Sequence, residues 1–488
     1  MRVFDRRSKL PCSLRRAAAG SMDDSTIAAI ATPAGAGGIS IIKISGPRAI
    51  AIASALFQGP SPGQPDAAQP VGFQSHRLHH GHIIDPANGT ILDEVLLSVM
   101  RAPHSYTCED VVEINSHGSP AAVQAIMEKV LRIGARLAEP GEFTRRAFLN
   151  GRIDLTQAEA VMDIINARSA RALEIFSAQL SGTLRQEILN LRGICVDLLS
   201  RVEAGIDFPE DVEEDFDGPA MAGYVRGQVI EPIRQLVRLH ADGRAIRDGL
   251  TVAIAGRPNV GKSSLMNRLL CRERSIVTQF PGTTRDAIED ILVIKGVPVS
   301  VWDTAGLQEP GDPVESIGIQ KTWERCEHAD LILFVLEAHK PLSEDDFRIF
   351  SKIRTRPVVC VFNKIDLLDQ TSREPELPRD WLQLPSVSVS ALKGLGLDDL
   401  RAAIIQSAWS EDVLSGPGKI MPNLRQKAVL ERCVEAAEAT AVCIENDGTP
   451  EIIAIHLKEV VDFLDEVLGA GVKTDILENI FNRFCIGK

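Results

Sequence analysis

The sequence predicts a multidomain protein of mixed α/β and α class, with an α+β domain first and a doubly wound α/β domain inserted into a helical bundle. Three observations lead to this prediction. Apolar runs typical of buried strands alternate with helical segments between residues 249 and 408. Helical periodicity fills residues 152–204 and returns over 426–445 and 451–468. Before residue 143, strand-like runs bounded by turn residues are interspersed with short helices.

We therefore divide the 488 residues into five segments. A basic leader over 1–22 precedes an α+β domain over 23–142. The helical domain is discontinuous, with a first part over 143–248 and a second part over 409–488. The α/β domain lies between them at 249–408. The chain ends of such a domain usually lie close together, so it can be inserted without breaking the bundle.

Composition limits the compartment and the partners. The formal net charge is −13, so any contact with nucleic acid depends on a local basic patch. Nine scattered cysteines without a CxxC pair indicate reduced thiols. No apolar run reaches the length of a membrane span, and we expect a cytoplasmic protein. The Arg-rich leader would fit a mitochondrial transit peptide, but we favour a disordered tail or an upstream start, with Met22 the natural beginning.

A phosphate-binding loop is predicted at Gly256–Ser263, which reads GRPNVGKS. The apolar run before it predicts a strand, and the residues after it predict a helix. In such a loop, backbone N–H groups close around phosphate oxygens at a helix N-terminus. Lys262 would reach the β- and γ-phosphates, and the Ser263 hydroxyl would bind Mg²⁺. The sequence therefore predicts a P-loop nucleotide site.

Four further segments complete the site, and two of them identify the nucleotide as GTP. The Asp366 carboxylate of the NKID motif can accept hydrogen bonds from the N1–H and N2–H₂ edge of guanine, and Ser390–Leu392 can offer a backbone N–H to the guanine oxygen. Asp303 would hold Mg²⁺ through water, and Thr284 would be its second hydroxyl ligand. The predicted GTP-binding residues are Asn259, Val260, Gly261, Lys262, Ser263, Ser264, Thr278, Gln279, Phe280, Pro281, Gly282, Thr283, Thr284, Asp303, Thr304, Ala305, Gly306, Asn363, Lys364, Asp366, Ser390, Ala391 and Leu392.

Motifs from all three regions resemble the tRNA-uridine-modifying GTPase family called MnmE or TrmE. These motifs are PGEFTRRAFLN at 140–150, DLTQAEA at 154–160, IDFP at 206–209 and the terminal CIGK at 485–488. Shorter matches lie at 26–33, 37–39 and 44–46. The resemblance implies an N-terminal folate-binding domain that dimerises, a discontinuous helical bundle and an inserted Ras-like P-loop GTPase domain.

The resemblance also implies partners and a product. The family acts as a homodimer, in a heterotetramer or larger complex with an FAD-containing MnmG-type flavoprotein. Together they add a carboxymethylaminomethyl-type group to C5 of the wobble uridine of certain tRNAs. A 5-formyl- or methylene-tetrahydrofolate derivative would be bound by Lys43, Glu113, Arg152 and Lys488. The family usually carries Arg where Lys43 stands and Lys where Arg152 stands, so charge is kept but bidentate geometry changes.

Catalysis departs from the Ras pattern, because the apolar Leu307 follows DTAG where Ras-like proteins carry a water-orienting Gln. The resemblance points to Glu315 instead, together with Lys262, and to K⁺ in place of an arginine finger. Cys485 is the candidate nucleophile or acid/base of the modification step. The K⁺ ligands would be Asn259, Thr278, Phe280 and Thr283, and the Mg²⁺ ligands Ser263 and Thr284.

Two rival readings remain. A potassium-dependent GTPase of ribosome assembly would share the phosphate loop and the GTTRD segment, but it would need a KH-like module or a tandem GTPase domain. A non-enzymatic switch is disfavoured by the intact set of Lys262, Ser263, Thr284 and Asp303. Turnover in KCl against NaCl and a folate-binding assay discriminate among the three.

Overall fold

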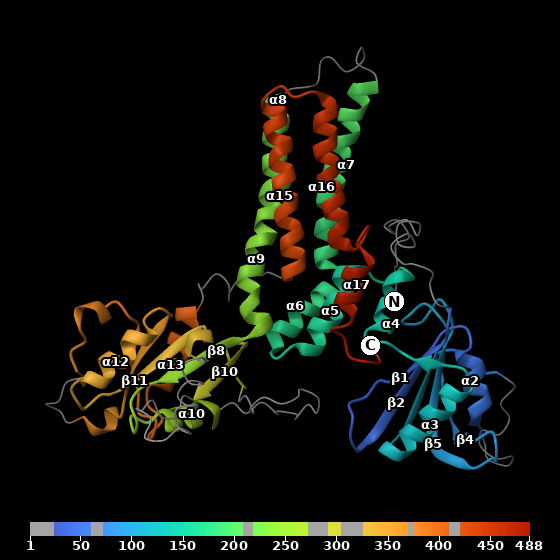
Figure 1. The fold of residues 1–488 in the computed structure, drawn as a ribbon, viewed down its shortest axis with the longest axis horizontal. Coiled ribbons are helices and arrows are strands. Elements are labelled where there is room, and N and C mark those ends of the chain that lie inside the picture. The colour runs from blue at the N-terminus through green and yellow to red at the C-terminus, as the bar shows by residue number, and fades with distance from the viewer. Residues whose placement is uncertain are drawn as a thin grey trace.

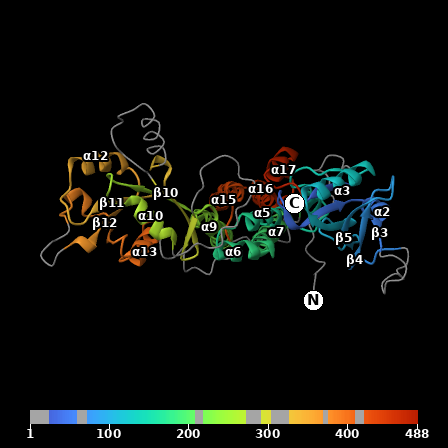
Figure 2. The same cartoon turned by 90° about the horizontal axis from the view of Figure 1, so that it is seen from below.

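The computed structural model describes residues 24–59, 72–207, 218–271, 291–303, 326–368, 375–408 and 420–488. Figure 1 shows a tall helical bundle with a sheet domain on one side of its base and a second α/β domain on the other. Seen from below, the three parts form a row with the bundle in the middle (Figure 2). The predicted fold class is confirmed. No helix in the described ranges is long and apolar enough to cross a membrane.

The N-terminal domain is a seven-stranded sheet with the strand order β3-β4-β5-β6-β2-β1-β7. Strand β2 shows why one face is covered, because Ile42 and Ile44 are buried while Lys43 between them points to the other face. The buried face packs against α2 and α3. The elements are β1 (Ile27–Ile30), β2 (Gly37–Ser45), α2 (Ala49–Leu56), β3 (Phe57–Gln58), β4 (Leu78–Ile84), β5 (Ile91–Met100), β6 (Val111–Gly118), α3 (Pro120–Arg132) and β7 (Arg136–Leu137).

Helices from two distant stretches of chain build the bundle around one core. Leu191 and Cys195 of the first stretch are buried together with Leu430, Cys433 and Leu464 of the second. The helices are α4 (Glu142–Leu149), α5 (Leu155–Asn166), α6 (Ala170–Leu180), α7 (Thr183–Asp207), α8 (Gly218–Val225), the π-helical η1 (Arg226–Ile230), α9 (Glu231–Asp248), α15 (Leu424–Glu445), α16 (Pro450–Leu468) and α17 (Thr474–Phe481). Because both stretches share this core, the bundle is one unit that the α/β domain interrupts in sequence only.

A buried ion pair joins the two stretches at the base of the bundle. Arg425 of α15 donates from Nε to Glu159 Oε1 of α5 over 2.7 Å and from Nη2 to Oε2 over 2.9 Å. Gln426 Nε2 donates to the same carboxylate over 2.6 Å. These contacts connect α5, which precedes the inserted domain in the sequence, to α15, which follows it.

The inserted domain is a six-stranded sheet with the order β13-β12-β11-β8-β10-β9, parallel except for β9. Apolar clusters cover both faces of the sheet, which explains the continuous apolar strands. The elements are β8 (Leu250–Ala255), α10 (Lys262–Cys271), β9 (Ile291–Ile294), β10 (Val297–Asp303), β11 (Leu331–Glu337), α12 (Glu344–Ile353), β12 (Val358–Asn363), η2 (Ile365–Leu367), η3 (Arg379–Trp381), β13 (Ser386–Ser388) and α13 (Leu397–Ala408).

The two chain crossings between bundle and inserted domain are bound to each other. Arg247 at the end of α9 donates from Nη2 to Asp163 Oδ2 over 3.1 Å and to the Met421 carbonyl over 3.2 Å. Gln179 of α6 donates to the same carbonyl over 3.0 Å. The Arg247 guanidinium lies 5.5 Å from the centre of the Phe176 ring. We call this set of contacts the crossing clasp.

Candidate functional site

The phosphate loop connects β8 to α10 at the carboxyl edge of the inserted sheet. Lys262 is buried, and its Nζ donates to the carbonyl oxygens of Gly256 and Arg257 over 2.9 and 2.8 Å. Asn259 and Gly261 both have positive φ, 64° and 98°. These angles turn the loop tightly into the first turn of α10, where Ser263 and Ser264 are exposed.

Asn363, at the end of β12, holds the phosphate loop against the segment Ser390–Leu392, which we call the base loop. Its Nδ2 donates to the Val260 carbonyl over 2.8 Å, and its Oδ1 accepts from the Ala391 N–H over 3.0 Å. A Cβ on Gly261 would lie 2.3 Å from Asn363 Nδ2, so glycine is needed there. One amide side chain thus fixes the spacing between the two loops.

Asp366, which we expect to recognise guanine, is held by Ser390. The Ser390 hydroxyl donates to Asp366 Oδ1 over 2.6 Å, and this bond lowers the pKa of the Asp366 carboxyl group. Ser390 is fully buried, whereas the neighbouring Leu392 is 77% exposed. The carboxylate is therefore ionised at neutral pH and oriented, as acceptance of two N–H groups requires.

Glu337 is a residue of this site that motif reasoning did not identify. It ends β11 and forms ion pairs with Lys364 and with Lys340, the latter at 2.9 Å. Burial alone would raise the pKa of Glu337, but hydrogen bonds from Lys364 and Lys340 lower it overall. Lys364 Nζ also donates to the Asn259 carbonyl over 2.6 Å, so Glu337 orients the lysine of the NKID motif against the phosphate loop. The sequence offered one signal for Glu337, which is a carboxylate at the end of the apolar run LILFVLE.

These residues fit a bound guanosine nucleotide with Mg²⁺. Glycine at 256 and 261 lets the loop pack closely, because a Cβ there would lie 2.5 Å from the Val335 carbonyl oxygen and 2.3 Å from Asn363 Nδ2. The helix α10 begins at the loop, and Lys262 supplies a buried cation. Asp303 is the last residue of β10, beside β8 in the sheet. The other predicted residues of this site, and the basic leader over 1–22, lie outside the described ranges and stay predictions: Thr278, Gln279, Phe280, Pro281, Gly282, Thr283, Thr284, Thr304, Ala305, Gly306 and Glu315.

The second candidate site lies where the C-terminal tail meets the N-terminal sheet, on the far side of the bundle base from the inserted domain (Figure 1). The Phe143 N–H donates to the main-chain oxygen of Lys488 over 3.1 Å, and the Gly141 N–H to the Cys485 carbonyl over 3.5 Å. Gly487 has φ 93°, and a Cβ there would lie 2.8 Å from the Ile30 carbonyl oxygen. The tail can lie this close to β1 because residue 487 is glycine. Cys485 is exposed.

The four predicted folate contacts come together around this docked tail. Lys43 of β2 and Glu113 of β6 are direct cross-strand partners, with Nζ and Oε1 3.8 Å apart. Burial is the main reason that the pKa of Lys43 is lowered; Glu113 opposes the shift and Lys488 adds to it. Lys43 Nζ and Arg152 Cζ lie 5.9 and 5.5 Å from the centre of the Tyr106 ring.

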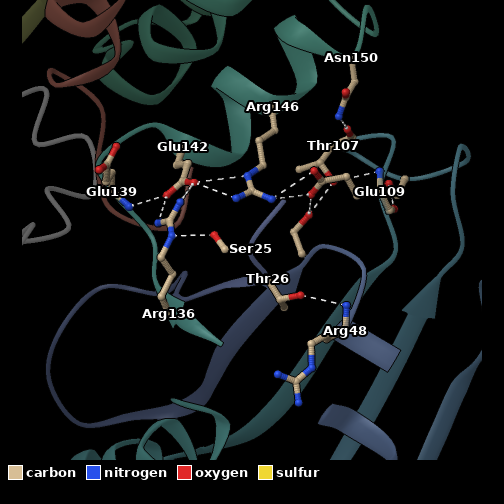
Figure 3. Close-up of polar contacts among 12 residues, drawn as sticks. Ser25, Thr26, Arg48, Thr107, Glu109, Arg136, Glu139, Glu142, Arg146 and Asn150 are labelled. Carbon is tan, nitrogen blue, oxygen red and sulfur yellow. Dashed lines mark hydrogen bonds and ion pairs between the residues drawn. The ribbon is translucent and has the colours of Figure 1, made fainter. Parts of the chain in front are cut away.

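A polar network holds the Tyr106 loop against α4 (Figure 3). Arg146 of α4 is buried and donates to Glu109 Oε1 and Oε2 over 3.1 Å each and to Glu142 Oε1 over 2.9 Å. Arg136 binds Glu142 with two hydrogen bonds, of 2.8 and 2.6 Å. Burial alone would raise the pKa of Glu142, but the bonds from Arg136 and Arg146 lower it overall. The network therefore fixes the helix that contributes Phe143 to the second site.

Comparison with known proteins agrees with this architecture. A family model described as the MnmE helical domain matches residues 155–485, and one described as the GTP-binding protein TrmE N-terminus matches residues 26–152. The tRNA modification GTPase MnmE of Moorella thermoacetica is 46% identical over 471 residues, 96% of this chain and 100% of that protein. Its counterpart from Syntrophobacter fumaroxidans is 44% identical, covering 95% of this chain and 98% of that one.

A third relative, the tRNA modification GTPase MnmE of Geobacillus kaustophilus, is 43% identical over 95% of this chain and 99% of its own. Among solved structures, Era from Aquifex aeolicus matches 38% of this chain and 66% of its own at 29% identity, with a TM-score of 0.27 that is too low to bear on the fold. Both family models and near-complete coverage of these relatives lead to one assignment. The chain belongs to the MnmE family, whose curated members carry the name tRNA modification GTPase.

Proposed function

We propose that this protein is a potassium-dependent GTPase that acts in tRNA wobble-uridine modification, as a homodimer with an FAD-containing MnmG-type partner, in the cytoplasm. Family membership supports the tRNA substrate over the ribosome-assembly alternative. The observation that carries the proposal is the coexistence of two sites in one chain. One site consists of the phosphate loop and the segment Ser390–Leu392, linked by Asn363. The other is a cation-rich site completed by the C-terminal tail.

At the first site, different residues would recognise the base, neutralise the phosphates and act on the attacking water. Asp366 would select guanine, and Lys262 would neutralise charge on the phosphates; Ser263 and Thr284 would hold the Mg²⁺ that adds to this charge. Glu315 would act on the attacking water through a second water. K⁺ held by Asn259, Thr278, Phe280 and Thr283 would supply the positive charge that other GTPases take from an arginine finger.

At the second site, Lys43, Arg152 and Lys488 would bind a tetrahydrofolate derivative together with Glu113. When bound, the tetrahydrofolate derivative would supply the one-carbon unit of the modification. Three cations and one carboxylate suit a ligand with carboxylates at one end and N–H donors at the other. The exposed Cys485 thiol, three residues from the Lys488 contact, is available as nucleophile or acid/base toward a substrate.

The test separates the two sites. In Cys485→Ser, GTP hydrolysis should stay within about twofold of wild type, which is ~0.4 kcal/mol in the barrier, while modified wobble uridine disappears. Mass spectrometry of wobble nucleosides from cells carrying only the variant measures the second outcome. The matched variant Glu315→Ala should stop hydrolysis at preserved GTP affinity and then stop modification. Normal modified uridine in Cys485→Ser cells would remove the thiol from the reaction.

A further inference from the structure

Tyr106 lies in the loop between β5 and β6, and the loop is fixed on both sides of it. Arg152 Nη1 donates to the carbonyl of the preceding Ser105. The following Thr107 shares a hydrogen bond of 2.7 Å with the Ser45 hydroxyl, and its carbonyl accepts from Asn150 Nδ2 over 2.7 Å. Figure 3 shows Thr107 and Asn150 beside the Arg146 network. The backbone at Tyr106 therefore has little freedom.

The side chain of Tyr106 is fixed as well. Its hydroxyl shares a hydrogen bond of 2.9 Å with Thr144 of α4, which is fully buried. Burial raises the pKa of Tyr106, so the phenol keeps its proton at neutral pH. With the loop and the hydroxyl both anchored, the direction of the ring face is set by the protein fold.

Two cations of the second site lie over this ring, from different elements. Lys43 Nζ is 5.9 Å from the ring centre and Arg152 Cζ is 5.5 Å from it, both within the range of cation–π attraction. Lys43 Nζ is also 5.9 Å from the Phe143 ring centre, so the ammonium has two aromatic neighbours.

The carboxylate partner of Lys43 does not fix the ammonium in the same way. The distance of 3.8 Å from Nζ to Glu113 Oε1 is longer than a hydrogen bond, and such a contact leaves the amino group free to shift. Lys488 adds a like charge nearby. Glu113 and the two aromatic faces therefore position the ammonium together, and Tyr106 is the ring that Lys43 shares with Arg152.

We propose that Tyr106 is a positioning residue of the second site: its ring holds the cationic groups of Lys43 and Arg152 at the separation that receives the carboxylates of a folate. This inference rests on the proposed function, because the ligand class is the tetrahydrofolate derivative assigned above. Tyr106 acts through the two cations and needs no bond to the ligand.

The experiment is titration of the full-length protein with 5-formyltetrahydrofolate by calorimetry, for wild type, Tyr106→Phe and Tyr106→Leu. Phe keeps the ring and loses only the bond to Thr144, so it should cost clearly less affinity than Leu. Leu removes the ring, and loss of two cation–π contacts should raise Kd roughly tenfold or more. If Leu fails to fold by thermal melting, Tyr106→Met replaces it. Equal affinity of the Leu and wild-type proteins, or equal loss in Phe and Leu, would overturn the role of the ring.

A double-mutant cycle separates positioning from packing. In an Arg152→Met background, Tyr106→Leu should cost clearly less affinity than in wild type, because one of the two cations is already gone. Additive losses would show a packing role and overturn the inference. If wild type does not bind 5-formyltetrahydrofolate at all, the folate part of the proposed function fails, which is a different result from wild-type binding that Tyr106→Leu leaves unchanged.

Discussion

Single residues set the geometry of both candidate sites through two or more contacts each. Asn363 joins the phosphate loop to the base loop, and Tyr106 lies between Lys43 and Arg152. Asp366 depends on Ser390 for its orientation and its lowered pKa. Substitutions at such residues are expected to change affinity more than stability, because the surrounding strands do not depend on them.

Asp366→Asn should weaken GTP binding by ~10²-fold or more and favour xanthosine triphosphate, since an unpaired polar edge is strongly rejected while an amide matches xanthine. Fluorescence titration with GTP and XTP measures both affinities. Ser390→Ala is the matched control, because it removes the bonds of the Ser390 hydroxyl to Asp366 and to the Lys393 N–H but keeps the carboxylate, and it should cost less. Unchanged GTP affinity in Asp366→Asn would refute the guanine assignment.

At the scale of elements, ion pairs between distant helices of the interrupted bundle differ in how much they stabilise it. The buried pair of Glu159 and Arg425 lies at the base, whereas Arg226 and Glu445 form an exposed pair near the other end. Burial alone would raise the pKa of Glu159, but Arg425 and its hydrogen bonds lower it overall. The stabilisation from a lowered carboxyl pKa is present above the ordinary glutamate value of 4.5 and is lost as pH falls through the folded-state value.

Glu159→Gln should therefore destabilise the bundle by about 3 kcal/mol at neutral pH, because Arg425 is left buried without its counter-ion. Thermal melting followed by circular dichroism measures the change, and the difference from wild type should shrink as pH falls below 4.5. Glu445→Gln at the exposed pair should leave the melting midpoint nearly unchanged. Similar losses in both variants would contradict the importance of burial.

At the scale of the whole molecule, the crossing clasp connects the nucleotide-binding domain to the bundle. Two of its polar atoms, Arg247 Nε and Gln179 Oε1, are buried and have no hydrogen-bond partner among the residues that the structure describes. Such half-satisfied groups weaken a buried contact, so the clasp can open at lower cost than the core around it. Arg247→Met should raise hydrogen exchange over 420–430 and leave 436–445 unchanged, measured by mass spectrometry. Arg226→Met is the control. Unchanged exchange at 420–430 in Arg247→Met would show that the clasp does not stabilise this segment.

The ion dependence also belongs to this scale, because K⁺ would link nucleotide chemistry to pairing of the GTPase domains. Replacing KCl by NaCl should lower kcat by at least ~10-fold, since the smaller ion fits a cage of carbonyl oxygens poorly. Light scattering with a transition-state analogue should show domain pairing in KCl alone. Equal rates in both salts would exclude Asn259 and residues 278–283 from catalysis.

The sequence by itself determined the features that depend on residues close together in the chain. Gly256–Ser263 could be identified because strand, loop and helix follow one another, and the bundle and both sheets follow from residue periodicity. The CIGK tail and the 140–160 motifs determined the family, which the comparisons confirm. The domain boundaries and the role of each site residue stay predictions.

Only the tertiary structure decided which distant residues meet. Glu159 and Arg425 are 266 positions apart, and neither has a local signal that names the other. Tyr106 carries no local signal, and only the packing of β2 against the segment after α4 places the cations of Lys43 and Arg152 over its ring. Glu337 gains a role only beside Lys364. The physical reason is that periodicity specifies which face of an element is buried, whereas the pairing of side chains across elements depends on the packing of the whole chain.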